Sequence, residues 1–278
     1  MMAETAYITD FGAVGNGIHD DTQAILDAQK AMYDVGAKTY RDAAVVKIPE
    51  PSNYYRTTRA IDLMSDRSHR VRFVGEGDKP LIRNVTREGD HDRAPVFRAG
   101  RLVAGGSDFT AAKQLWRNMQ PAEAGQKIVK FEGAGLDLSP DDMVFVAGGE
   151  RMWHGKDTNR GNPADWYSTE AQISVVDFVD SEGVHLVDPL LDDHLEWQLC
   201  RYPYGVSYGG VRNLRLEQTN AIARPYGFPG VAGGGAYRMG YRDLHFPLAV
   251  SCFAVNGHAR CLFENIGGNV AKKGIELA

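Results

Sequence analysis

A turn built around three glycines near the start of the chain constrains the fold more than any other feature. Gly12, Gly15 and Gly17 follow a short apolar stretch that reads as a strand. Glycine supplies backbone conformations that other residues avoid, so the chain can reverse sharply here. The next polar residues, Asp20 and Asp21, are both suited to capping the N-terminus of a helix. We therefore expect the order strand, turn, helix.

The segment after this turn is predicted to be a short amphipathic helix that ends at Gly36. Its apolar residues recur at the spacing of one helical face: Ile25, Ala28, Met32 and Val35. Beyond the helix the period changes to the alternation that is typical of short strands. These apolar alternations include Val46 and Ile48, Ile61 and Leu63, and Val71 and Phe73.

The opening residues Asp10-Phe-Gly-Ala-x-Gly-Asn-Gly-x-x-Asp-Asp-Thr-x-Ala-Ile resemble the opening signature of pectate-lyase-like β-helix proteins, a superfamily that includes rhamnogalacturonases, epimerases and phage tailspikes. The family order continues in Val46-Val-Lys-Ile-Pro49, Tyr55, Ile61-x-Leu63 and Gly75-Glu-Gly77. One turn departs from it, because Pro49-Glu-Pro51-Ser-Asn-Tyr54 stands where the family has Pro-x-Gly-x-Tyr. The resemblance implies an all-β, right-handed parallel β-helix with an N-terminal capping helix.

Three segments are expected along the chain. Residues 1–90 form the cap and first strands, 91–205 an irregular segment with a small inserted antiparallel β elaboration, and 206–278 further rungs, incomplete at the C-terminus. Four strands are predicted in the elaboration, within residues 126–131, 142–146, 173–179 and 183–187, with a hairpin turn at Ser181-Glu-Gly183. Three Arg-x-Leu units suggest the rungs: Arg212-Asn-Leu214, Arg242-Asp-Leu244 and Arg260-Cys-Leu262.

The net charge and the composition limit the classes of molecule that the chain is expected to bind. The net charge of -5 argues against nucleic acid or an anionic membrane surface as a partner, although a local basic groove for an acidic polymer stays compatible with it. Residues 1–10 show no basic segment followed by an apolar run, so we expect no signal peptide in the given chain, and no apolar run approaches the roughly 20 residues of a membrane span. Cys200, Cys252 and Cys261 are too few for a disulfide framework and are interpreted as free thiols.

The outward positions of the last rungs hold the candidate catalytic residues. If Leu244 and Phe246 point inward, Asp243 and His245 share an outward face and can form an acid/base pair, although solvated polar side chains are equally typical there. Candidates for a second carboxylate are Glu217 and Glu264. A lyase also needs a cation beside its base, and the candidates are Arg242, Arg260, Lys272 and Lys273.

A second candidate site is a loop rich in aromatic residues. Trp153, His154, Trp166 and Tyr167 lie in a connection rich in Gly, Asn and Pro, and Lys272 is assigned to the same substrate-binding set. Such rings can stack on sugars, or they can anchor the loop as a small aromatic core. No metal site is assigned. Calcium is the one ion considered, at the acidic clusters Asp141-Asp142 and Asp192-Asp193-His194, and no other cofactor is expected.

Two functions remain open at this point. The first is a lyase or glycoside hydrolase that acts on an acidic or complex polysaccharide, and an epimerase shares its proton chemistry. The alternative is a non-catalytic glycan-binding or structural module, such as a portion of a phage tailspike, which would imply a homotrimer. The resemblance implies an extracellular or virion-associated protein in either case.

Overall fold

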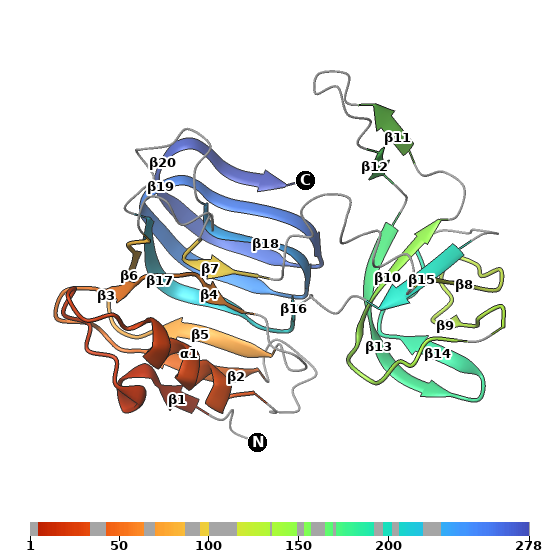
Figure 1. The fold of residues 1–278 in the computed structure, drawn as a ribbon, viewed down its shortest axis with the longest axis horizontal. Helices are drawn as coiled ribbons and strands as arrows, with labels where there is room; N and C mark the ends of the chain where they lie inside the picture. Colours follow the sequence, from red (N-terminus) through yellow and green to blue (C-terminus); the bar gives the residue numbers. More distant parts are fainter. Residues whose placement is uncertain are drawn as a thin grey trace. The chain divides into compact units, whose positions relative to one another are not determined.

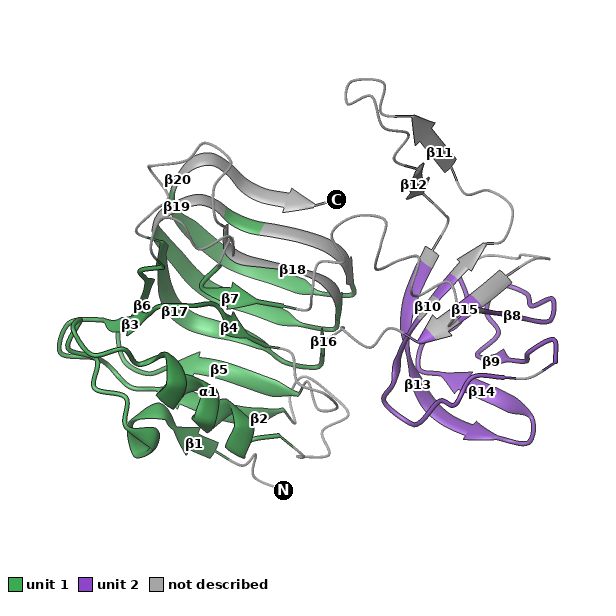
Figure 2. Ribbon diagram, viewed as in Figure 1, with its two compact units in different colours: residues 1–102, 204–278 green, residues 103–203 purple. Residues whose placement is uncertain are grey.

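The computed structural model describes residues 5–33, 43–63, 70–86, 95–99, 116–133, 135–148, 153–156, 165–168, 171–191, 197–201, 206–218 and 229–277. It contains two compact units, residues 1–102 with 204–278, and residues 103–203 (Figure 2). No helix in the described ranges is long and apolar enough to cross a membrane.

Unit 1 is a stack of parallel strands in three columns, which we name faces A, B and C (Figure 1). Face A holds β1 (Thr5–Tyr7), β2 (Ala44–Ile48), β5 (Val71–Gly75) and the first residues of β17 (Gly210–Gln218), β19 (Gly240–Ala259) and β20 (Leu262–Leu277). Face B holds β3 (Tyr55–Thr57), β6 (Leu81–Asn84) and the middle residues of the long strands. Face C holds β4 (Ile61–Asp62), β7 (Phe97–Arg98), β18 (Pro229–Tyr237) and the ends of β19 and β20. This arrangement confirms the predicted parallel β-helix.

The long strands bend from one face to the next at residues with positive φ. Asn213, Asp243 and Asn265 have φ values of 55°, 54° and 53° and stack on one another between faces A and B. Asparagine and aspartate adopt this left-handed conformation more readily than other residues with side chains. The two-residue alternation of a flat strand is therefore interrupted once at each of these corners.

Inward side chains fill the centre of the stack. Phe73, Val211 and Tyr241 from face A meet Phe97 and Phe253 from face C, and all five are fully buried. The ring centroids of Phe73 and Phe97 are 5.2 Å apart, and those of Tyr241 and Phe253 are 5.3 Å apart. Such pairs add about 0.5–1.5 kcal/mol each beyond their buried area. The core thus joins the columns.

The predicted repeat is correct for two rungs and wrong for the third. Arg212 aligns with Arg242, but the next residue in this column is Glu264, not Arg260. The third equivalent of the repeat is therefore Glu264-Asn-Ile266. The reason is the length of the rung: Arg242 and Glu264 are 22 residues apart, whereas Arg212 and Arg242 are 30 apart and Arg242 and Arg260 only 18.

Helix α1 (Thr22–Ala31) covers the first rung, as predicted from the opening residues (Figure 1). Ile25 is fully buried in the core, and Met32 packs against it. Asp21 is the N-cap residue, but its side chain makes no capping hydrogen bond, and the Oδ1 of the preceding Asp20 accepts the Thr22 N–H at 3.1 Å. The helix ends before Gly36, which lies outside the described residues.

The side chain of Asp21 binds the glycine turn instead of capping the helix. Its buried carboxylate accepts hydrogen bonds from the backbone N–H groups of Val14 at 2.7 Å, Gly15 at 3.3 Å and Arg56 at 3.2 Å. Gly15 has a φ of 64°, and a Cβ there would lie only 2.7 Å from Pro51 Cβ. The turn from Pro49 to Tyr54, which differs from the family pattern, is thus reshaped and packs tightly on the glycine turn.

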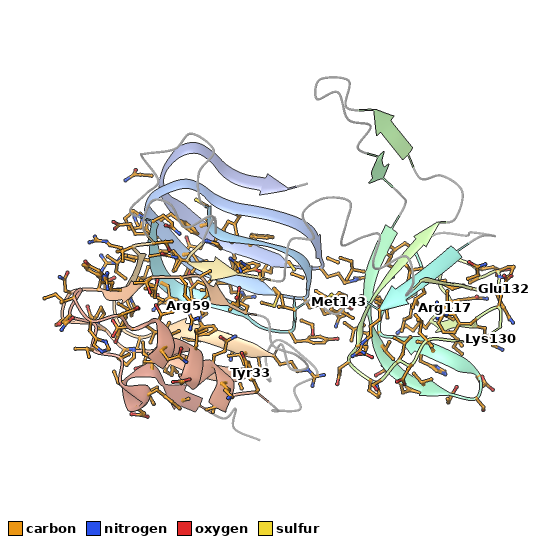
Figure 3. The ribbon with its side chains drawn as sticks, in the orientation of Figure 1. Tyr33, Arg59, Arg117, Lys130, Glu132 and Met143 are labelled. Atoms are coloured by element: carbon orange, nitrogen blue, oxygen red, sulfur yellow. The ribbon has the colours of Figure 1, made fainter. Side chains whose placement is uncertain are left out.

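Unit 2 confirms the antiparallel elaboration and adds to it. Its sheet has the order β8 (Trp116–Asn118), β15 (Trp197–Arg201), β10 (Met143–Gly148), β13 (Ala171–Asp180), β14 (Gly183–Leu186) and β9 (Ile128–Val129). The two end strands also meet. Gln120 N donates to Lys130 O at 2.8 Å and Glu132 N to Asn118 O at 3.0 Å, and Figure 3 shows Lys130 and Glu132 at this seam. The six strands therefore close into a small barrel around an aliphatic core.

The barrel sequence is inserted between two short strands that both pair with β18 on face C. Arg98 of β7 pairs with Ala232, and Val206 of β16 (Val206–Ser207) pairs with Ala236. On β18 only residues 233–235 separate these two pairings, whereas residues 99–205 separate them along the inserted sequence. The strand resumes in register after the insertion, so face C does not depend on what is inserted.

Candidate functional site

Face B brings together charged side chains from neighbouring rungs. Arg83 aligns with Glu217, and Arg215 aligns with His245. Arg215 and His245 lie one rung apart, at the roughly 4.8 Å spacing of paired strands. Glu217 lies two residues after Arg215 on the same strand, so all four point to the same side of the sheet. We name these four residues the face B cluster.

The Arg83 and Glu217 side chains form an ion pair within this cluster, with one hydrogen bond. Arg83 Nε lies 2.9 Å from Glu217 Oε1, and its Nη2 donates to Oε2 at 3.2 Å. The guanidinium carbon also lies 4.1 Å from the ring centroid of Tyr54. Burial acts to lower the pKa of Arg83, but the hydrogen bond and charge of Glu217 outweigh it, so the pKa is raised. The ion pair and the Nη2 hydrogen bond hold the two side chains together.

The Arg215 and His245 pair is the more accessible part of the cluster. Arg215 is exposed, and its Nε donates to Lys79 O at 2.8 Å, which orients the guanidinium. His245 is half-buried, and the next residue in its column is Gly267. A Cβ on Gly267 would lie 3.9 Å from its nearest described neighbour, His245 Nδ1. The surface beside the imidazole is thus not crowded by a side chain of the next rung.

Asp243 does not share a flat face with His245, which corrects the expected pair. Leu244 and Phe246 point inward as predicted, and His245 is on face B. Asp243, however, is the left-handed corner residue, with a φ of 54°. Its Oδ1 accepts a hydrogen bond from Asn265 Nδ2 at 2.7 Å. The positive φ interrupts the alternation on which the prediction depended.

Arg242 and Glu264 lie on face A. Their side chains form an ion pair between neighbouring rungs, with 3.1 Å between Arg242 Nε and Glu264 Oε2. The five predicted catalytic residues are therefore divided, with Glu217 and His245 on face B, Asp243 at the corner, and Arg242 and Glu264 on face A. Their catalytic roles stay predictions.

The aromatic loop of the sequence prediction contains a hairpin of β11 (Trp153–Lys156) and β12 (Asp165–Ser168). Trp153 pairs with Ser168, and His154 with Tyr167. The side chains of this hairpin and of Lys272, which lies in β20, are outside the described part of the structure. Their substrate-binding assignment stays a prediction.

The Asp141-Asp142 cluster is part of a turn and an ion pair. Asp141 has a φ of 72°, and Asp142 accepts the Ser139 N–H at 2.9 Å and contacts Arg201 Nη2 at 2.8 Å. Asp192-Asp193-His194 lies outside the described residues. Within the described ranges, no group of three or more His, Cys, Asp or Glu side chains is placed to hold a metal ion.

Three residues of the site escaped the sequence analysis: Tyr54, Arg83 and Arg215. Arg215 lies inside one of the three repeats, so its position between two inward leucines was a usable signal. Arg83 and Tyr54 could not be found in this way, because only the pairing of β6 with β17 places them beside Glu217.

Comparison with family models finds no match, and comparison with curated proteins finds none either. Solved structures do show a likeness. The tailspike gp49 of Pseudomonas phage LKA1 is 14% identical with a TM-score of 0.47, over 95% of this chain and 49% of the tailspike. PfbA, a surface adhesin of Streptococcus pneumoniae, is 14% identical with a TM-score of 0.45, over 96% of this chain and 38% of the adhesin. The mannuronan C-5 epimerase AlgE4 A-module of Azotobacter vinelandii is 14% identical with a TM-score of 0.37, over 99% of this chain and 53% of the epimerase module.

This chain spans about half of those proteins or less. Its fold is established by its own strand pairing, in which three columns of parallel strands stack behind a capping helix. That pairing bears out the fold that the opening residues indicate, a parallel β-helix behind a capping helix.

Proposed function

We propose that this chain recognises an acidic or complex polysaccharide, and that the face B cluster is the binding site. The observation that supports this most is the alignment of exposed Arg215 with His245 on the neighbouring rung. Guanidinium, imidazole and carboxylate groups are planar hydrogen-bonding groups that suit sugar hydroxyl and carboxylate oxygens. Because rungs repeat every 4.8 Å or so, a polymer lying along the stack would meet several of them.

Cleavage by a lyase mechanism is a second candidate function, favoured by the same alignment. In such a reaction a base removes the proton from the carbon that bears the uronate carboxylate, and the bond from the adjacent carbon to the glycosidic oxygen breaks. A double bond forms between these two carbons, and the departing oxygen takes a proton from water. His245 would be the base, and Arg215 would stabilise the negative charge that develops on the carboxylate. Hydrolysis has less support, because both Glu217 and Glu264 are held by arginines.

The experiment for binding compares wild type with Arg215→Gln and His245→Gln on a glycan array. Each substitution keeps an outward polar side chain, so both variants should fold. We expect retention of acidic or complex glycans to fall about tenfold in either variant, since one charged hydrogen bond is worth about 1.5 kcal/mol. Arg59→Gln, an exposed change in the turn between β3 and β4, serves as the control. Undiminished retention by both variants would remove face B from the site.

The lyase candidate is tested with wild type on uronate polymers, followed by the absorbance of the new double bond. His245→Gln should lower this rate by about a hundredfold or more. Full activity in that variant would exclude His245 as the base.

The environment and assembly of the protein belong to the same proposal. We propose an extracellular or virion-associated setting, and a homotrimer if the chain is part of a tailspike. Light scattering on the purified chain measures the mass of the assembly directly, and a monomer would contradict the trimer.

A further inference from the structure

A β-bulge in unit 2 turns a large aromatic side chain out of the barrel core, in the hairpin of β13 and β14 (Figure 1). Val176 of β13 pairs with Leu186, and both are buried in the core. In an unbroken strand Phe178, two residues later, would also point inward. The pairing shifts register between Val176 and Phe178, so Phe178 lies opposite His185 instead. Bulges redirect side chains in this way, and Phe178 is 43% exposed.

The ring of Phe178 is held in one orientation by the imidazole beside it. The two ring centroids are 3.8 Å apart, and the ring planes are 19° from parallel. His185 is itself held in place, because only 15% of its side chain is exposed and the residues on either side, Val184 and Leu186, lie in the core. Since the imidazole covers one face of the phenyl ring, the exposed surface of Phe178 is its opposite face and its edge. The hairpin thus presents a flat, fixed apolar surface.

A carboxylate lies on the same side of this hairpin. Asp180 follows Phe178 by two residues, so both side chains point outward. Its Oδ1 accepts the N–H groups of Glu182 at 2.8 Å and Gly183 at 3.2 Å, and lies 3.1 Å from His185 Nε2. The Glu182 N–H contributes most to a lowered pKa of Asp180, and the other two groups act in the same direction. No described residue donates a hydrogen bond to Oδ2, so this charged oxygen can accept one from a ligand.

The ring and the carboxylate match the two kinds of surface on an uncharged sugar. The C–H groups on one side of a pyranose ring form an apolar face that packs on an aromatic ring, and the hydroxyl groups at its edge donate hydrogen bonds to carboxylate oxygens. A uronate or sulfated sugar fits less well, because its negative charge would lie beside Asp180. An apolar protein surface also fits less well, since Phe178 is flanked by the exposed carboxylates of Asp177 and Asp180.

We propose that Phe178, Asp180 and His185 form a binding site for a neutral sugar residue on unit 2. Phe178 packs against the C–H face of the sugar, Asp180 Oδ2 accepts a hydroxyl hydrogen bond, and His185 is a positioning residue for both. This site goes beyond the proposed function, because it selects an uncharged sugar and uses no residue of the face B cluster.

The test titrates the full chain with neutral hexaoses of glucose, galactose and mannose, with hexagalacturonate as the acidic probe, and follows the proton NMR signals of the sugars. A proton that lies over a phenyl ring shifts upfield, so the shift reports stacking directly. We expect an upfield shift in at least one neutral hexaose with wild type. Phe178→Leu keeps an apolar side chain without the ring, and should lose the shift and bind about tenfold more weakly.

Two further variants complete the design. Asp180→Asn removes the charged acceptor while its amide oxygen can still accept the turn N–H groups, and it should also weaken binding about tenfold. Leu191→Ala removes another exposed apolar side chain of unit 2, and should bind as wild type does. Tryptophan fluorescence checks the folding of every variant, because all four tryptophans lie in unit 2.

Three results would overturn the inference: wild type that binds no neutral hexaose, unchanged binding in Phe178→Leu, or an equal loss in Leu191→Ala. Loss of hexagalacturonate binding alone in Phe178→Leu would overturn the neutral specificity. The upfield shift in wild type needs no variant, so the test holds even where a substitution disturbs folding. Arg215→Gln and His245→Gln should bind the neutral probes normally, which separates a failure of the face B proposal from a failure of this one.

Discussion

Asp21 gives the sharpest prediction about what holds the cap on the β-helix. Its carboxylate is fully buried and accepts three backbone N–H groups, from Val14, Gly15 and Arg56, at 2.7, 3.3 and 3.2 Å. His19 Nδ1 lies 3.0 Å from the same carboxylate. A hydrogen bond to a charged group contributes about 1.5–3 kcal/mol, and a buried N–H left without a partner costs a similar amount. Asp21→Ala should therefore lower the free energy of unfolding by about 3–5 kcal/mol.

The assay must distinguish the unfolding of unit 1 from that of unit 2, and the positions of the tryptophans make this possible. All four tryptophans, at 116, 153, 166 and 197, lie in unit 2, so tryptophan fluorescence reports on unit 2. Hydrogen exchange of the unit 1 amides, measured at increasing urea concentration, reports on unfolding of the β-helix. We expect the unit 1 transition to move to lower urea and the fluorescence transition to stay. Asp27→Ala, an exposed change on the same helix, is the control. A loss under 1 kcal/mol in Asp21→Ala would refute the reasoning.

Three further outcomes are expected. Ile25→Asp should abolish or strongly lower the stability of unit 1, because it places an unpaired charge at a fully buried position, and an unchanged melting temperature contradicts this. Replacing Trp153 and Trp166 together by Ala should weaken glycan retention without unfolding the chain, and equal retention on an array would remove that hairpin from the site. Burial raises the pKa of Cys252 to about 11 and that of Cys261 to about 12, so both thiols should resist alkylation at pH 8 and react only after unfolding, as measured by mass.

The sequence predicts the cap correctly because its determinants are local. The glycine turn, the acidic pair and the face of Ile25 all lie within one short segment, and each has a direct physical meaning. What this segment does not reveal is the division of labour between Asp20 and Asp21. Both are suited to capping, and the structure shows that Asp21 instead binds Val14 and Gly15 in the turn and Arg56, 35 positions away.

The rungs and the barrel are less predictable because they depend on distant pairing. The first two repeats, at Leu214 and Leu244, align, but the shortened rung before Leu262 shifts the third. Nothing in the local pattern announces that shift. In unit 2 the four predicted strands are present, yet closure of the barrel depends on Met119 pairing with Phe131 across the seam.

Asp243 separates a structural role from a catalytic one, and a single substitution distinguishes them. Asn213 and Asn265, which stack on it between faces A and B, adopt the same left-handed conformation, so asparagine fits this position without strain. Asp243→Asn should change the free energy of unfolding by less than about 0.5 kcal/mol, whereas Asp243→Val should cost about 1–2 kcal/mol for the left-handed backbone. Because Asp243 lies at the corner and not beside His245 on face B, we also expect Asp243→Asn to retain glycan binding and any turnover on uronate polymers. The measurements are urea unfolding of unit 1 for both variants, and double-bond absorbance for the asparagine variant. A loss of turnover of about a hundredfold in Asp243→Asn, with stability unchanged, would instead make its carboxylate part of the chemistry.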